Sequence, residues 1–340
     1  MMGERRFRWA LVLTGALLCL PLPAAAQPLA TPVTEARTLL ADMAGAYRSR
    51  TFTGRLVYLY GNDVTTLAVR HAVIDGIEYE RLSHLDGRAE LLRVGQQVLA
   101  VHPDGSVTRM PNRDGRSVVS LFDRMAEQLP AQYSVLLDGD ARVAGRSAIR
   151  LRVRPLDNHR YGYRLWVDRD SKLLLKSETL DPNNAPLERM EFVQLELSPP
   201  LTAADFAPPP THRYHAIEDL GAIREISPNI EPGWLPAGFV PLQRDLRRSA
   251  PVHQPVAALA YGDGLASFTL FVQGVPEGAS VEQGVSRMGP TLAMTRHAQA
   301  SQGGGLLLVL VGEIPQDTAE RIMDHVVIGG HALEQGADGQ

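Results

Sequence analysis

The stretch RYGYRLWVDRDSKLLLKSE, Arg160 to Glu178, contains the alternation that decides the fold of the first half of the chain. It predicts two strands joined at a turn near Asp170. One parity is apolar and comprises Tyr161, Tyr163, Leu165, Val167, Leu173 and Leu175. The other parity carries Arg164, Asp168, Lys172, Lys176 and Glu178. Because successive side chains of a strand point to opposite faces, we expect an antiparallel sheet with one face in water and one over a core or a ligand.

The first 26 residues have the composition of a secretory signal peptide. Three arginines, at positions 5, 6 and 8, precede an apolar run from Trp9 to Leu22, and three alanines end at Ala26. This order predicts cleavage after Ala26. An uncleaved membrane anchor is the alternative, but the apolar run is short for a membrane span. Cys19 follows two leucines instead of a small residue, which does not fit a lipoprotein processing site.

The remaining chain, from Gln27 onwards, is long enough for two domains. The one cysteine of the sequence lies in the leader, so we expect neither a disulfide nor thiol chemistry in the exported protein. The net charge is −4 and becomes more negative without the leader's arginines, which argues against nucleic acid as a partner. These features predict a protein of a bacterial periplasm.

Residues 27–198 predict one domain in which many strands accompany two helices. Apolar residues at helical spacing predict helices at Val33–Tyr47 and Ser117–Leu129. Alternating segments separated by turn residues predict the strands Phe52–Tyr60, Val64–Ile74, Ile77–Leu85, Leu91–Val94, Gln97–His102, Tyr133–Leu137, Arg142–Val143, Ser147–Val153, Tyr161–Val167, Lys172–Leu180 and Leu187–Leu197. The apolar faces of both kinds of element must meet, so we expect an α+β fold in which a half-open antiparallel barrel wraps over the helices.

A proline-rich linker is expected at residues 199–233, followed by a smaller α+β domain at 234–328. In that domain the predicted strands are Val256–Tyr261, Ser267–Gln273, Thr291–His297 and Leu306–Val311, and a final helix begins at Pro315. Residues 329–340 are expected to form a disordered tail.

The sequence contains no recognisable catalytic constellation. It lacks a Gly-x-Ser-x-Gly elbow, and His212 and His215 lack the glutamate and the spacing of a zinc-protease helix. Gly303–Gly305 leads into a strand and lacks a following Lys-Ser/Thr pair, so it predicts a turn and not a phosphate loop. We therefore expect no catalytic residue, no metal site and no cofactor.

The apolar face of the first domain is the candidate binding surface. Its aromatic residues predict either ordinary sheet packing or a lining that accepts acyl chains or a peptide. Two short helices are not expected to cover so many strands, so part of this face should line a cavity of ligand size. The candidate lipid-binding residues are Phe52, Leu56, Tyr58, Leu67, Val69, Leu165 and Leu175.

Several motifs resemble the RseB/MucB family of periplasmic sigma-E regulatory proteins. They lie in both predicted domains and in order along the chain. They are the segments Phe52–Tyr58, Glu80–Leu82, Leu85–Gly87, Arg142–Arg146, Pro155–Asp168, Leu173–Ser177, Trp234–Phe239, Asp263–Ser267 and Gly312–Pro315. One departure is Gly289-Pro290, where a small residue would be expected in place of the proline.

The resemblance implies a first domain similar to the lipoprotein carriers LolA, LolB and LppX, and a second domain that helps to grip an anti-sigma factor. It implies binding to the periplasmic part of a membrane-anchored anti-sigma factor of the RseA/MucA type, which is shielded from regulated proteolysis until lipid or lipopolysaccharide relieves the shielding. The alternatives are a lipoprotein or lipid carrier, which needs only the first domain, and an envelope enzyme. The sequence leaves the partner-binding residues and the oligomeric state open, a homo-oligomer included.

We predict that the exported protein begins at Gln27, because small alanines precede the expected cleavage site. N-terminal sequencing of the protein from the periplasmic fraction tests this prediction. Recovery of a membrane-bound product that still carries Trp9 to Leu22 would contradict it.

Overall fold

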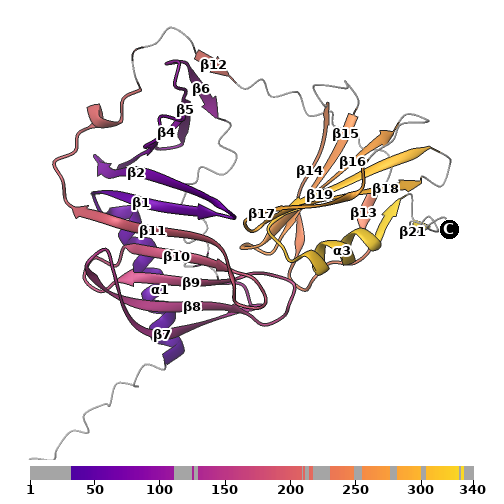
Figure 1. Cartoon of the computed structure of the whole chain (residues 1–340), viewed down its shortest axis with the longest axis horizontal. Coiled ribbons are helices and arrows are strands. Elements are labelled where there is room, and N and C mark those ends of the chain that lie inside the picture. The colour runs from indigo at the N-terminus through magenta and orange to yellow at the C-terminus, as the bar shows by residue number, and fades with distance from the viewer. Residues whose placement is uncertain are drawn as a thin grey trace, which may run out of the picture.

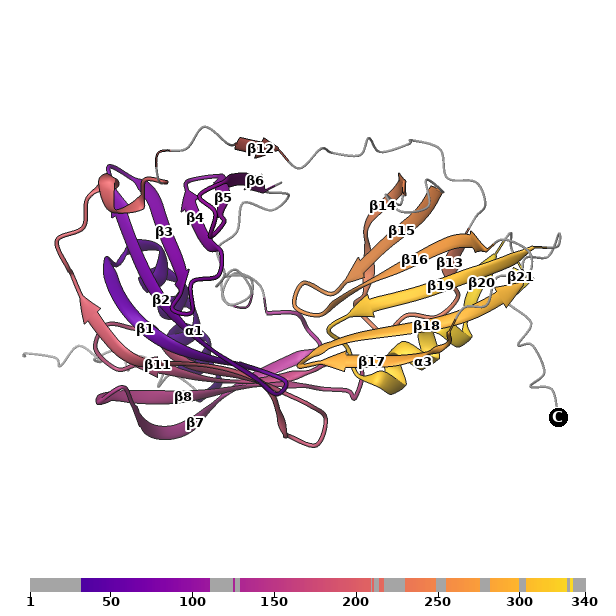
Figure 2. The ribbon, with the colours of Figure 1, turned by 45° about the horizontal axis from the view of Figure 1, so that its top comes forward.

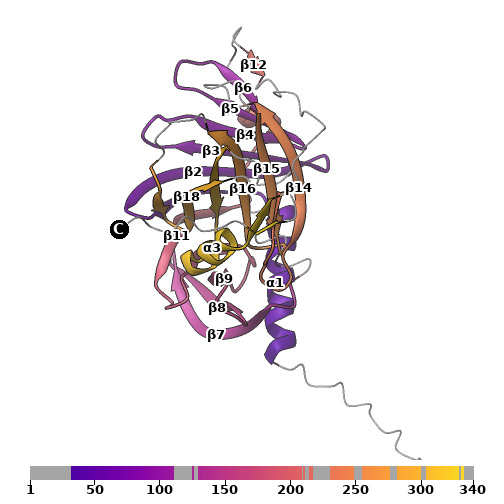
Figure 3. The same ribbon diagram turned by 90° about the vertical axis from the view of Figure 1, so that its right-hand side faces the viewer.

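The computed structural model shows two sheet domains side by side (Figure 1). It describes residues 32–110, 125, 129–208, 210, 214–216, 230–248, 255–275, 282–299, 304–328 and 331–332. Figure 3 views the chain from the C-terminal domain, which lies in front of the N-terminal domain. No helix among these residues is long and apolar enough to cross a membrane.

The N-terminal domain is built on one twelve-stranded sheet. Its strands in chain order are β1 (Phe52–Tyr60), β2 (Asp63–Ile74), β3 (Ile77–His84), β4 (Glu90–Val94), β5 (Gln97–Val101), β6 (Val107–Met110), β7 (Tyr133–Val143), β8 (Arg146–Pro155), β9 (Gly162–Asp168), β10 (Leu174–Leu180), β11 (Pro186–Leu197) and β12 (Tyr214–Ala216). The spatial order is β12-β6-β5-β4-β3-β2-β1-β11-β10-β9-β8-β7, and all pairs but β12 with β6 are antiparallel. The sheet curls without closing (Figure 2), which confirms the expected half-open antiparallel barrel.

Helix α1 (Pro32–Ser49) covers the apolar side of this sheet, as its periodicity predicts. Its buried Leu40 and Met43 pack in a cluster with Leu151 and Leu165 of the sheet. The expected second helix at 117–129 falls outside the described residues except for Met125 and Leu129. Met125 is buried in the same cluster.

Between residues 52 and 197, strand boundaries agree with the sequence within a few residues, with two differences. The two segments predicted at 133–137 and 142–143 form the single strand β7, which is interrupted by a register shift between Leu137 and Asp140. Strand β6 was not predicted, because it is short and follows turn residues.

On the charged face of β9 and β10 the acidic side chains are buried and the basic ones half-buried, so the expectation that this face lies in water is wrong. Asp168 is fully buried, and Arg146 donates to its carboxylate at 2.9 and 3.0 Å. Glu178 is 3% exposed and accepts from Arg164 at 2.8 Å and from Arg189 at 2.9 Å. Side chains of neighbouring strands form ion pairs with these carboxylates and shield them from water. The alternation of charged residues therefore did not indicate an exposed face here.

Part of the expected linker at 199–233 is ordered. The short helix η1 (Ala203–Phe206) places Phe206, 1% exposed, against the ring of Tyr79 at 5.4 Å. Strand β12 adds to the edge strand β6, and β13 (Ile230–Pro232) already belongs to the second domain through its pairing with β20 (Val326–Ile328).

The C-terminal domain is a six-stranded antiparallel sheet backed by α3 (Gln316–Asp324) and a small second sheet. The six strands are β14 (Val240–Arg248), β15 (Pro255–Gly262), β16 (Ser267–Val275), β17 (Gly284–Met288), β18 (Thr291–Gln299) and β19 (Gly305–Gly312). The four predicted strands are β15, β16, β18 and β19, whereas β14 and β17 were not predicted. Within the expected disordered tail, β21 (His331–Ala332) pairs with β20, so disorder does not extend to those two residues.

A buried arginine joins the two domains. Arg160, which begins the stretch quoted above, has a fully buried side chain. Its Nη1 atom donates to Asp263 Oδ2 of the C-terminal domain at 2.5 Å, and its Nη2 atom donates to the carbonyl oxygen of Ala237 at 2.8 Å. Nε donates to Asp157 at 3.1 Å. The guanidinium also lies over the rings of Tyr133 and Phe239, one from each domain.

Apolar and hydroxyl contacts extend this joint on both sides of Arg160. Leu265, from the turn between β15 and β16, packs into the apolar cluster of the N-terminal domain and is 4% exposed. Tyr161 donates to the carbonyl oxygen of Ile314 at 2.8 Å. Tyr60 hydrogen-bonds Thr291, and a Cβ atom at Gly289 would approach the Tyr60 ring to 3.0 Å, so this position needs a glycine.

We predict that Asp263→Asn lowers the free energy of unfolding by about 3 kcal/mol, because it removes the fully buried one of the two carboxylates that pair with Arg160. Thermal and urea unfolding of the full chain measure the loss. The matched control is Asp324→Asn, since Asp324 pairs with Arg296 where both side chains are about one third exposed. That pair should contribute at most about 1 kcal/mol. Equal losses of unfolding free energy in the two variants would show that the buried pair of Arg160 and Asp263 stabilises the protein no more than the exposed pair does.

Candidate functional site

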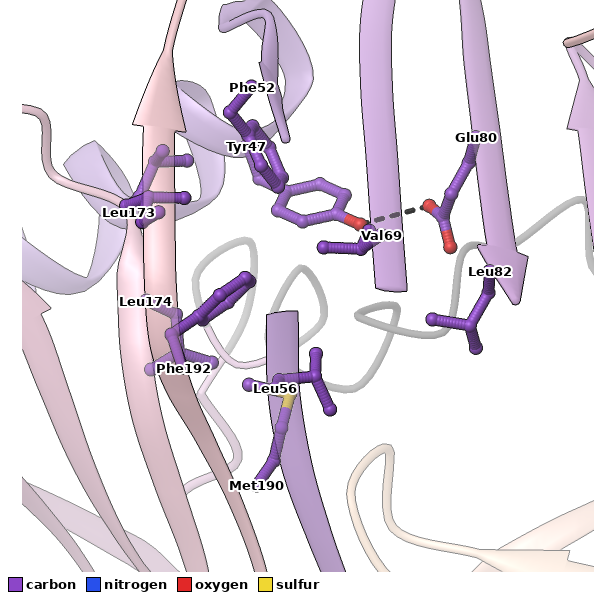
Figure 4. Close-up of a pocket in the computed structure, with 11 residues that line it drawn as sticks. Tyr47, Phe52, Leu56, Val69, Glu80, Leu82, Leu173, Leu174, Met190 and Phe192 are labelled. Atoms are coloured by element: carbon purple, nitrogen blue, oxygen red, sulfur yellow. Dashed lines mark hydrogen bonds between the residues drawn. The ribbon is translucent and has the colours of Figure 1, made fainter. Parts of the chain in front are cut away.

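An apolar cavity lies between the C-terminal end of α1 and the middle of the sheet (Figure 4). It is lined by side chains from α1, from the adjacent strands β1, β2 and β3, and from β10 and β11 on the other side of β1. The lining residues are Tyr47, Phe52, Leu56, Val69, Glu80, Leu82, Leu173, Leu174, Met190, Phe192 and Leu195. Residues distant in sequence meet here because β11 pairs with β1 and closes the meander.

The cavity is small and has one polar end. Its enclosed volume is about 30 Å³, which suffices for a water molecule, whereas a typical ligand pocket is roughly 300–1,000 Å³. The cavity beside the candidate residues is therefore much smaller than the expected cavity of ligand size. At the polar end the Tyr47 hydroxyl donates to Glu80 Oε2 at 2.9 Å, as the dashed line in Figure 4 shows.

Five of the seven candidate residues lie in or beside this cavity. Phe52, Leu56 and Val69 line it directly. Leu67 is buried in the same apolar cluster, and the half-buried Tyr58 packs against that cluster. These five residues, which the alternation in β1 and β2 placed on one face, therefore lie on one surface in the structure.

The other two candidates lie elsewhere. Leu165 packs beneath α1 with Leu39 and Met43, where no ligand can reach it without moving the helix. Leu175 lies in a separate cluster with Trp166. A register shift between Leu174 and Lys176 puts Leu175 out of phase with Leu165, which pairs with Ser177. The expectation that Leu165 and Leu175 share one face is wrong for this reason.

Sequence reasoning missed the part of the lining that comes from α1 and β11. Tyr47 was predicted only as part of the apolar side of its helix. Met190 and Phe192 were predicted to lie in a strand, but not on which face of it they lie. Their alternation is the signal that could have found them, because residues two apart on a strand share a face. Their position opposite Leu56 and Tyr58 depends on the pairing of β11 with β1, including a register shift between Arg55 and Leu56.

A second group of ionisable residues lies between the cavity and the domain joint. Burial, together with the negative charge of Glu313 in the C-terminal domain, raises the pKa of Glu188 to about 7, against the lowering effect of a hydrogen bond with Tyr58. Burial, followed by the charge of Glu188, raises the pKa of Tyr58 as well. The two glutamates come from different domains, so the charge of Glu188 is sensitive to how closely the domains approach.

The walls of the site, as far as the structure describes them, are almost entirely apolar. Among the described ranges, no group of three or more His, Cys, Asp or Glu side chains could hold a metal ion. The cavity has apolar walls apart from Glu80 and the Tyr47 hydroxyl. Such a site suits the binding of an apolar ligand or segment.

Comparison with known proteins gives the same family for both domains. Residues 35–210 match the MucB/RseB N-terminal domain, and residues 225–327 match the MucB/RseB C-terminal domain. Among curated proteins, the chain is 35% identical over 320 residues to the sigma factor AlgU regulatory protein MucB of Pseudomonas aeruginosa, covering 92% of this chain and 94% of that protein. It is 28% identical over 338 residues to the sigma-E factor regulatory protein RseB of Escherichia coli K12, covering 96% and 99%.

Solved structures agree with the sequence matches. The complex of Pseudomonas aeruginosa MucA and MucB contains a chain with a TM-score of 0.69 and 31% identity, covering 89% of this chain and 99% of that one. The crystal structure of MucB in complex with MucA(peri) gives a TM-score of 0.66 and 33% identity, covering 86% and 98%. With both domain families matched in order and a relative 35% identical along most of its length, the chain belongs to the MucB/RseB family of sigma factor regulatory proteins.

Proposed function

We propose that this protein is a periplasmic negative regulator that binds the periplasmic part of a membrane-anchored anti-sigma factor of the MucA type and shields it from regulated proteolysis. The observation that carries the proposal is the match to both family domains, together with relatives whose solved structures are complexes with MucA. The apolar lining of the described site fits a binding protein.

The contacts between the two domains favour a regulatory protein over a lipid or lipoprotein carrier. A lipid or lipoprotein carrier needs only the first domain, yet here Leu265 and Asp263 of the second domain are built into the first. The relative position of two domains is a natural two-state element, because a ligand can prefer one arrangement over another. We therefore favour a protein whose domain geometry sets the affinity for its partner.

The expected result is that the full chain binds a purified periplasmic segment of the cognate anti-sigma factor and slows its cleavage by an added protease. Calorimetry measures the affinity, and a segment of the same composition in scrambled order is the control. Asp263→Asn should weaken binding, because it removes the interaction that fixes the domains relative to each other. A full chain that shows no affinity for the segment, but carries lipid between vesicles, would favour the carrier alternative.

We further propose that the cavity beneath α1 opens to admit an acyl chain and that lipid and anti-sigma factor bind antagonistically. The apolar lining supports the first part, and its volume of about 30 Å³ means that side chains or α1 must move for an acyl chain to enter. If the opened arrangement binds the anti-sigma factor less well, linkage requires each ligand to weaken the other by the same factor. Such couplings are typically about 5–150-fold.

Leu56→Asp should weaken binding of a fluorescent fatty acid by about tenfold or more, because a carboxylate in the apolar lining has no partner. Val193→Asp is the matched control, since Val193 lies on β11 but is 56% exposed. Melting curves identify any variant that has lost its fold. Unchanged fatty-acid binding by a folded Leu56→Asp protein would show that the cavity is ordinary core. Fatty acid that leaves the wild-type affinity for the anti-sigma segment unchanged would rule out the antagonism.

A further inference from the structure

His71 of β2 is the one buried histidine among the residues that the structure describes, and its side chain is fully buried. It lies directly behind the cavity. In the sheet register it is opposite Phe52 on β1 and Glu80 on β3. Its ring stacks on Phe52 at 5.1 Å and lies 4.7 Å from the ring of Tyr47. Phe52, Tyr47 and Glu80 all line the cavity, so any change at His71 reaches the cavity wall.

Both ring nitrogens of His71 face hydrogen-bond acceptors. Nδ1 lies 2.8 Å from the carbonyl oxygen of Arg50, immediately after the end of α1. A carbonyl oxygen only accepts, so Nδ1 must carry a proton. Nε2 lies 3.1 Å from Glu78 Oε1. If Glu78 is ionised, Nε2 must carry a proton too, and the ring is then an imidazolium.

The surroundings of Glu78 keep its carboxyl group ionised. Burial opposes ionisation, but the hydrogen bonds from His71 and Arg93 outweigh it and lower the pKa of Glu78 to about 2. Arg93 pairs with the same oxygen, Oε1, and therefore favours the carboxylate form of Glu78 independently of His71.

The charged groups around His71 favour a positive charge on its ring. The groups that face His71 are the Tyr47 hydroxyl and the Arg50 carbonyl from the α1 end, the Phe52 ring from β1, Glu78 and Glu80 from β3, and Arg93 from β4. Arg93 pairs with both glutamates. Two acidic side chains thus share one guanidinium, and an imidazolium at His71 supplies a second positive group beside them.

We propose that His71 is held as a buried imidazolium that ties the C-terminal end of α1 to β3, and that loss of its second proton loosens the wall of the apolar cavity. The stabilisation exists only while the ring carries both protons, so it is lost as the pH rises and that proton leaves. On the acid side it is lost as the pH falls toward about 2, where Glu78 becomes protonated. The cavity wall is therefore tightest in the range between these two events, and base loosens it.

Nitrogen NMR of the complete exported chain labelled with ¹⁵N-histidine tests the first part. At pH 7 both ring nitrogens of His71 should have the chemical shifts of protonated nitrogens, with the signals assigned by their absence from His71→Gln. A pH series then locates the loss of the proton. Fluorescence of the apolar dye ANS, followed over the same series, should rise where the ring loses its charge. An unprotonated ring nitrogen at pH 7 would overturn the proposal, as would a deprotonation that leaves dye binding unchanged.

Glu78→Gln provides the matching substitution, because it removes the charge that retains the second proton but keeps the size of the side chain. At pH 7 its His71 should be neutral, its melting temperature lower by about 5 °C or more, and its dye binding higher, as in the wild type in base. Glu90→Gln is the control on neighbouring β4, where Glu90 pairs with Arg81 and does not contact His71. A Glu78→Gln protein that keeps a charged His71 and the stability of the control would overturn the proposal. If Glu78→Gln does not fold, the NMR and dye-binding pH series of the wild-type protein tests the proposal by itself.

Discussion

The buried ion pair between Arg160 and Asp263 is the interaction on which the arrangement of the two domains depends. Charged groups can leave water only when their hydrogen bonds are made and their charges are matched. Arg160 meets this condition with two carboxylates, one carbonyl oxygen and two aromatic rings. Asp263 meets it with Arg160 and the backbone amides of Leu265 and Ala266, each at 2.8 Å. The same carboxylate thus shapes the turn that inserts Leu265 into the first domain, so the turn and the ion pair between the domains share one side chain.

The N-terminal sheet is covered on both faces at β9 and β10, and the two faces are stabilised differently. One face packs apolar side chains against α1. The other contains ion pairs centred on Asp168 and Glu178, each of which accepts from more than one donor. Hydrogen bonds from Arg146 and Ser171 outweigh the effect of burial and keep the pKa of Asp168 below its usual value. Such networks fix strand register, because a slipped strand would leave a charge unpaired.

The protein combines these rigid features with a small, imperfectly filled region beneath the end of α1. A cavity of about 30 Å³ with apolar walls lies where α1, the first strands and β11 meet. Filling it with a larger apolar group requires movement of α1 or of the neighbouring side chains, since protein interiors otherwise pack closely. Glu188 of β11 and Glu313 of the C-terminal domain interact electrostatically across the boundary between the domains, next to this region. Movement at the cavity can therefore change the relative position of the domains that the proposed partner contacts.

Alternation and turn residues in the sequence predicted most of the strands, α1 and α3, and the two-domain organisation, whereas the family came from the resemblance of whole motifs. Local pattern suffices for these because side-chain periodicity follows from backbone geometry alone. It also grouped Phe52, Leu56 and Val69 on one surface, since they lie on adjacent strands joined by a short turn. The tertiary structure alone decided the rest. The register shift at Leu174 moved Leu175 away from Leu165, neighbouring strands buried charges that alternation placed in water, and Arg160 met Asp263 103 residues away. These three features depend on which segments, distant in the sequence, lie next to each other in the fold. The sequence of a single strand does not specify the neighbouring segments that pack against it.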